Sequence, residues 1–265
     1  MYSAGNPATV YSHIEAAAYH TRHLVDLKEG MTLDGLRFIN SGVHALAGGG
    51  DHITVRNCAI ENIGGCAWNK DLQIRFGNGF EIWENGNEIL VENCFFQNIY
   101  DSCVTHQGPG DKTHPAHRFI CRSCVFDTYG MAAFEYRDKM PVDSSFTENI
   151  CLNAGCGFAM LGETMPRRSE IWPRPMGHHI FMWRIDEKTE HGDLRIENNL
   201  FGGAPEGAAI YSIISPQAEA QVTLDGNRYT PNSTLLLRWG GTDYCDLDAF
   251  RQATKQEKHG SYARA

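Results

Sequence analysis

The chain has 265 residues, of which 42% are hydrophobic, with 27 glycines and a formal net charge of -9. This size suits one compact domain or one elongated repeat domain, and the many glycines favour short strands joined by tight turns. No apolar run approaches the ~18 residues of a membrane-spanning helix, and the acidic net charge argues against nucleic-acid binding. We therefore expect neither a membrane nor a nucleic acid as partner.

The amino-terminal segment, residues 1–17, reads MYSAGNPATVYSHIEAA and lacks the basic-then-apolar pattern of a signal peptide. It is also unlike the beginning of a domain, so we expect a further amino-terminal portion in the natural protein. The expected location depends on that portion: secreted or periplasmic if it is missing here, and cytoplasmic otherwise.

A short sequence motif then recurs along the chain, in which alternating apolar and polar residues are followed by Asn or a residue that replaces it. The clearest copies are ITVRNCAIENIG (53–64), ILVENCFFQNIY (89–100) and FICRSCVFDTYG (119–130). Aligned copies place one corner residue each at Gly35, Asn57, Asn93, Ser123, Asn149, Asn198 and Gly226. The irregular spacing of the copies indicates stacked coils whose loops differ in length, with the Asn column hydrogen-bonded along the axis.

Cysteine follows the corner residue in three copies, at Cys58, Cys94 and Cys124. Free cysteine is among the most buried residue types, so we expect these three side chains to stack in the interior. This placement argues against a disulfide framework.

A second strand is predicted after each corner. Its copies are NGFEIW (78–83), SCVTHQ (102–107), MAAFEYR (131–137), CGFAML (156–161) and GAAIYSI (207–213). Two or three short strands per repeat, stacked through successive repeats, predict an all-β fold: a right-handed parallel β-helix, or single-stranded solenoid.

The carboxyl-terminal stretch DLDAFRQATKQEKHG (246–260) places Leu247, Phe250 and Ala253 at helical spacing behind Asp246. This pattern predicts a short amphipathic helix that covers the open end of the solenoid. The expected organisation is a β-helix over residues 1–243, without its amino-terminal cap, and a capping helix and tail over 244–265. We expect a monomer.

Several of these motifs resemble the pectate-lyase-like superfamily of right-handed β-helix proteins. The same resemblance is found in MTLDGLRF (31–38), FEYRD (134–138) and the carboxyl-terminal tail. The resemblance implies this fold over most of the chain and a bacterial carbohydrate-active protein acting on a polysaccharide or oligosaccharide. It does not select a reaction, because the fold hosts lyases, hydrolases, epimerases and non-catalytic adhesins.

Period two along the second strands predicts two outward rows. The first row holds Glu81, Thr105 and Glu135, and the second holds Trp83, Gln107 and Arg137. Ala159 and Leu161 are expected to continue these rows. The two glutamates would lie two strands apart, at roughly 9–10 Å, which is near the upper end of the ~6.5–9.5 Å separation of inverting glycosidases.

Neighbouring residues complete the predicted site. Trp83 would stack on a sugar ring, while Thr105, Gln107 and Arg137 would contact substrate. Asp101 stands at the corner before Thr105, where it could act as the acid, orient Thr105, or only cap the turn. His106 falls on the inward side of its strand, so we expect it to be buried.

The longest insertion lies between Glu163 and Gly192 and carries Arg167 and Arg168, which could hold a substrate carboxylate. No Cys and His residues have zinc-finger spacing, and no acidic calcium cluster is visible, so we expect no metal and no other cofactor. Calcium is the one ion that the resemblance keeps open.

The leading hypothesis is a glycoside hydrolase in which one of Glu81 and Glu135 protonates the leaving oxygen and the other activates water. A polysaccharide lyase is the first alternative, with Arg137, Arg167 and Arg168 available to neutralise a uronate carboxylate. A non-catalytic glycan-binding module is the second.

Overall fold

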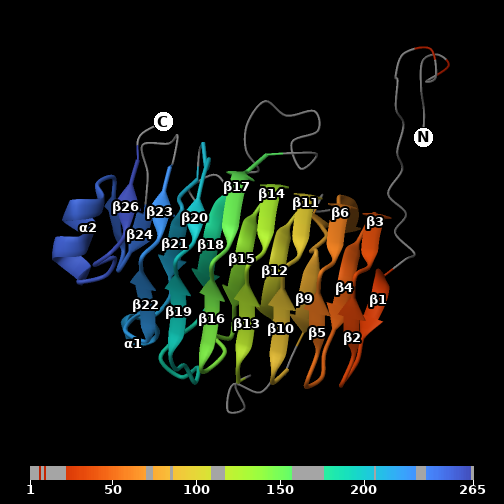
Figure 1. The fold of residues 1–265 in the computed structure, drawn as a ribbon, viewed down its shortest axis with the longest axis horizontal. Helices are drawn as coiled ribbons and strands as arrows, with labels where there is room; N and C mark the ends of the chain where they lie inside the picture. The colour runs from red at the N-terminus through yellow and green to blue at the C-terminus, as the bar shows by residue number, and fades with distance from the viewer. Residues whose placement is uncertain are drawn as a thin grey trace.

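The computed structural model describes residues 6, 9, 22–69, 74–83, 86–108, 117–156, 176–205, 207–230 and 237–263. In this part of the chain, three long sheets are built from strands that pair in parallel with strands of the next coil. Figure 1 shows the coils following one another in chain order, from β1 at the red end to β26 at the blue end. The prediction of an all-β solenoid of stacked parallel strands is confirmed.

The three long sheets are called A, B and C. Each complete coil contributes one strand to each of them, and along the chain these strands follow the order B, C, A. Sheet A contains, in spatial order, β1 (His23–Leu27), β4 (His44–Gly48), β9 (Phe80–Trp83), β12 (Ser102–Gln107), β15 (Ala132–Arg137), β18 (His178–Trp183), β21 (Ile210–Ile213), β24 (Leu237–Trp239) and β25 (Thr242–Tyr244). Sheet B contains β2 (Thr32–Asp34), β5 (Thr54–Arg56), β10 (Ile89–Glu92), β13 (Phe119–Arg122), β16 (Ser144–Thr147), β19 (Leu194–Glu197) and β22 (Val222–Asp225).

Sheet C contains β3 (Arg37–Ser41), β6 (Ala59–Ile63), β11 (Phe95–Ile99), β14 (Val125–Tyr129), β17 (Ile150–Ala154), β20 (Leu200–Phe201), β23 (Arg228–Tyr229) and β26 (Ser261–Tyr262). Two pairs are antiparallel: β24 with β25, and the hairpin of β7 (Cys66–Asn69) with β8 (Ile74–Phe76). No helix among the described residues is long and apolar enough to cross a membrane.

The corner between sheets B and C requires a left-handed backbone. It is occupied by residues with φ between 50° and 68°: Gly35, Asn57, Asn93, Ser123, Glu148, Asn198 and Gly226. Asn and Gly adopt this conformation at low cost, which explains their recurrence in the sequence. The fifth corner was wrongly predicted at Asn149. The pairing of Thr147 with Glu197 aligns Glu148 with Asn198, so Asn149 takes the next, interior position.

That interior position forms a buried column through the solenoid. Its first members are Cys58, Cys94 and Cys124, which are buried as predicted. The column then changes to amides: the Asn149, Asn199 and Asn227 side chains each accept from the backbone N–H of the preceding member, at 2.9 Å. Members of the corner column are also hydrogen-bonded to each other: Asn93 donates to Asn57 at 2.6 Å, and the Ser123 hydroxyl donates to Glu148 at 3.2 Å. Side-chain hydrogen bonds along the axis therefore occur in both columns.

The carboxyl-terminal helix α2 (Leu247–Thr254) begins where the sequence predicts it. The Asp246 carboxylate caps it by accepting from the Ala249 N–H at 2.8 Å, and Phe250 packs on Trp239 and Tyr244. A shorter helix, α1 (Pro216–Glu219), precedes β22. After α2 the chain returns to the solenoid, because β26 pairs in parallel with β23.

One predicted strand lies outside the described part of the chain. Residues 157–161, which include Ala159 and Leu161, are among those that the structure does not describe. The two neighbours of β15 in sheet A are β12 and β18. The row of Glu135 continues to Phe181, and the row of Arg137 continues to Trp183.

Candidate functional site

The outer face of sheet A brings the predicted site residues into register. Glu81 pairs with Thr105 on one side, and Glu135 pairs with Thr105 on the other. In the neighbouring row, Gln107 pairs with Trp83. The strand register therefore places Glu81, Thr105 and Glu135 in one row, with the two glutamates two strands apart.

Their outward direction does not make these carboxylates exposed. Both side chains point outward from the solenoid, yet Glu81 is only 6% exposed and Glu135 only 1%. The physical reason is that neighbouring polar and aromatic side chains from adjacent coils close over them. Each carboxylate accepts hydrogen bonds from such side chains.

Glu135 accepts three hydrogen bonds from side chains of two neighbouring strands. Ser102 and Thr105 donate to its Oε2 atom at 3.0 and 3.1 Å, and the Trp183 indole N–H donates to Oε1 at 2.7 Å. Burial raises the pKa of the Glu135 carboxyl to about 7, and the nearby negative charge of Asp101 also acts to raise it. The carboxyl is therefore protonated in a large fraction of molecules at neutral pH.

Glu81 lies in a different environment, made mostly of amides. Its Oε2 atom accepts from Asn78 Nδ2 at 2.5 Å and from Gln107 Nε2 at 3.0 Å. His44 Nδ1 is 3.4 Å from the same oxygen, but this nitrogen accepts the Asn78 backbone N–H at 3.0 Å. Because Nδ1 accepts this N–H, it has no proton to donate to Glu81 in this arrangement.

Asn78 also joins the two carboxylates into one network. Its Oδ1 atom accepts from the Ser102 backbone N–H at 2.9 Å, and the Ser102 hydroxyl reaches Glu135. Neither Asn78 nor Ser102 was predicted, and Ser102 was missed because strict alternation was assumed along its strand. Cys103 and Val104 both point into the core, so the alternation shifts by one residue and Ser102 faces outward.

An aromatic cluster adjoins Glu135 on the next coils. Phe181 and Trp183 are stacked with ring centroids 5.4 Å apart, and they pack with Tyr211 in a separate apolar cluster. The guanidinium carbons of Arg137 and Arg184 lie 4.9 and 4.4 Å from the Trp183 ring centroid. Trp183 was not predicted, although the alternation in HHIFMWR (178–184) could have revealed its strand.

The remaining predicted site residues divide into three groups. Asp101 is 8% exposed and immediately precedes Ser102, so it belongs to the carboxylate network. His106 is buried as predicted and stacks on Phe119 with centroids 6.0 Å apart. Arg167 and Arg168 lie outside the described residues. Among the residues that the structure describes, no group of three His, Cys, Asp or Glu side chains is arranged to hold a metal ion.

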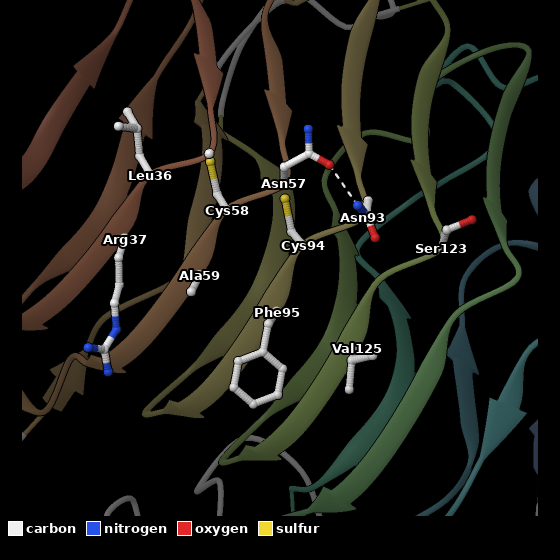
Figure 2. A pocket seen from close by; sticks show the side chains of 11 residues that line it. Leu36, Arg37, Asn57, Cys58, Ala59, Asn93, Cys94, Phe95, Ser123 and Val125 are labelled. Carbon is white, nitrogen blue, oxygen red and sulfur yellow. Dashed lines mark hydrogen bonds between the residues drawn. The ribbon is translucent and has the colours of Figure 1, made fainter.

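An open hollow of about 480 Å³ lies elsewhere, at the corner between sheets B and C. Figure 2 shows that Asn57, Asn93 and Phe95 line it, with the sulfurs of Cys58 and Cys94. No carboxylate lines this hollow, so it lacks the acid and base that hydrolysis requires. The carboxylate network on sheet A is therefore the better candidate site.

Comparison with protein-family models, curated proteins and solved structures found no match.

Proposed function

We propose that the protein is a right-handed parallel β-helix of the pectate-lyase-like type that hydrolyses a glycosidic bond in an oligosaccharide or polysaccharide. The handedness follows the strong preference of crossovers between parallel strands. In this proposal Glu135 is the general acid and Glu81 the general base. The observation that carries the proposal is the burial of Glu135, which raises the pKa of its carboxyl to about 7, two strands from a second carboxylate that amides hold.

The hydrogen bonds to Glu135 define which oxygen would carry its proton. The Trp183 indole N–H can only donate, so Oε1 must remain an acceptor. The proton then resides on Oε2, beside the Ser102 and Thr105 hydroxyls, which can accept as well as donate. A leaving oxygen would be protonated from this side of the carboxyl.

The position of Glu81 supports an inverting reaction. Two strand spacings of ~4.8 Å put its backbone roughly 9–10 Å from that of Glu135, which leaves room for a water molecule beside the sugar. Glu81 would take a proton from this water as it attacks the anomeric carbon. The bond to the leaving oxygen breaks as Glu135 donates its proton.

A non-catalytic glycan-binding module is the second candidate, and the burial of both carboxylates favours it. A lyase is less supported, because Arg137 is already engaged by Trp183 and by Asp138, at 3.3 Å. Arg167 and Arg168 remain the residues proposed for the lyase alternative.

Incubation with a panel of neutral and acidic glycans tests the proposal. We expect new reducing ends without the ultraviolet absorbance of an unsaturated product. Glu135→Gln should reduce the rate by at least about a hundredfold, the usual scale for loss of a general acid. Glu148→Gln, at an outer corner of the solenoid, is the matched control. Unsaturated products would identify a lyase, and no product would favour the binding module.

A further inference from the structure

Gln107 carries a buried acceptor that nothing in the described part of the chain satisfies. The side chain is on the outer face of β12 and is 4% exposed. Its Nε2 atom donates to Glu81, but its Oε1 atom is buried without a hydrogen-bond partner. A buried carbonyl oxygen without a donor is uncommon in folded proteins, and it requires an explanation.

The orientation of this amide is fixed by its neighbour. Reversing the oxygen and nitrogen would place Oε1 against the Glu81 carboxylate at 3.0 Å, where both atoms are acceptors. The oxygen is therefore the atom that has no partner among the described residues. Arg137, the next residue of this row, is engaged by Trp183 and Asp138.

An exposed aromatic side chain lies directly beside this acceptor. Trp83 pairs with Gln107 across β9 and β12, and it is 41% exposed, unlike the other residues of the carboxylate network. An exposed indole next to a polar group is suited to a sugar, whose ring has an apolar face and whose edge carries hydroxyls.

We propose that Trp83 and Gln107 form a subsite for a neutral sugar ring. The apolar face of the ring stacks on the Trp83 indole, and one hydroxyl donates its hydrogen to Gln107 Oε1. A hydroxyl can satisfy this acceptor, whereas a carboxylate or sulfate cannot and would also approach the negative charge of Glu81. The subsite rests on the proposed function for the identity of the ligand as a glycan.

Tryptophan fluorescence and calorimetry test this subsite without requiring cleavage. The probes are neutral trisaccharides of glucose, mannose, galactose and xylose, together with trisaccharides of uronic acids. We expect at least one neutral probe to bind and the uronates to bind more weakly. Gln107→Met should weaken the binding of that neutral probe by about tenfold, because the hydroxyl loses its acceptor. Trp83→Ala should weaken it as well.

Affinity, rather than stability, distinguishes a ligand-binding role from a structural one. Gln107→Met removes the unsatisfied oxygen but also the Nε2–H donor to the buried Glu81 carboxylate, so a lower melting temperature is expected in either role. Gln97→Met on sheet C is the matched control, and it should not alter binding. Analogues of the bound probe that each lack one hydroxyl identify the group that donates to Gln107. One of these analogues should bind the wild-type protein about tenfold more weakly than the probe does, and Gln107→Met should not weaken its binding further.

Three results would overturn the subsite: no neutral probe binds, uronates bind more tightly, or Gln107→Met leaves the affinity for the neutral probe unchanged. Because binding is measured directly, a failure of hydrolysis would leave this result standing. Conversely, hydrolysis with unaltered affinity in Gln107→Met would reject only the subsite.

Discussion

Tyr136 shows how a single buried group can reduce the stability of this fold. The side chain is fully buried, and no described residue forms a hydrogen bond with its hydroxyl. We expect Tyr136→Phe to raise the free energy of unfolding by about 1 kcal/mol, because it removes an unsatisfied polar group and keeps the ring. Urea unfolding measures this change.

Tyr129→Phe is the matched control for this substitution. The Tyr129 hydroxyl lies 2.5 Å from His179 Nδ1, and the other ring nitrogen of His179 bonds to the Gly202 carbonyl. Removing the hydroxyl leaves the buried Nδ1 acceptor without its donor, so unfolding should become easier by about 1–3 kcal/mol. A loss of stability in both variants would show that the Tyr136 hydroxyl does have a partner.

Glu135 should make stability depend on pH near neutrality. Its pKa is raised to about 7 in the folded protein, above the ordinary value of 4.5. Between these values the unfolded chain loses the proton and the folded protein keeps it, so stability falls as pH rises. The loss of stability is absent below pH 4.5 and complete above pH 7, where it is on the order of 3 kcal/mol.

Glu135→Gln should therefore flatten the stability profile between pH 5 and pH 8, measured by urea unfolding at each pH. The amide can replace the acid, since its oxygen accepts from Trp183 and its nitrogen donates to the Ser102 and Thr105 hydroxyls. An unchanged slope in the variant would assign the pH dependence to other groups.

At the scale of elements, the interior amide column connects the coils. Asn199 accepts from the Asn149 N–H, and its own Nδ2 atom donates to the Phe146 carbonyl and to Asn227. Asn199→Ala leaves at least two buried backbone groups unsatisfied, so we expect a loss of about 2–4 kcal/mol. Asn198→Gly, at the adjacent left-handed corner, should change stability by less than about 1 kcal/mol. Equal losses in thermal or urea unfolding would contradict this account.

The column ends at Glu257, in the segment after α2. Its carboxylate accepts from the backbone and side chain of Asn227 and from the Tyr229 hydroxyl. Glu257 is fully buried, and burial raises its pKa. The carboxyl-terminal tail therefore does more than cover the last coil, because it supplies the last acceptor of the column.

The sequence predicted the repeating elements well because their causes are local. Alternation along a strand and a left-handed corner leave a signature within a few residues, which sufficed for the stacked coils and for α2. The prediction failed at Glu148 and Asn149, because asparagine occupies the corner position in some coils and the interior position in others. It also failed at Ser102, where two successive inward residues break the alternation.

The carboxylate network could be predicted only in part, since its remaining contacts are not local. Trp183 is 48 residues from Glu135 in the chain, yet it provides a hydrogen bond that orients the carboxyl. The burial of both glutamates likewise depends on side chains from adjacent coils. Strand parity gives the direction of a side chain but not what surrounds it.

At the scale of the whole molecule, the cysteines report on the integrity of the solenoid. Seven of the free thiols are buried, Cys156 is partly buried, and Cys245 is exposed. Burial raises the pKa of thiols such as Cys103 and Cys151, which suppresses the reactive thiolate. We expect iodoacetamide to modify Cys245 first in the native protein and the seven buried thiols only on unfolding, as read by mass spectrometry. Rapid native labelling of the buried set would contradict the stacking of the coils.

The proposed chemistry depends on one carboxyl group that keeps its proton at neutral pH. Carbon-13 NMR of protein labelled at the glutamate carboxyl carbons follows this titration directly, and Glu135→Gln assigns the resonance. The account predicts a midpoint for Glu135 near pH 7. A midpoint at or below the ordinary value of 4.5 would mean that Glu135 is ionised at neutral pH and cannot serve as the general acid.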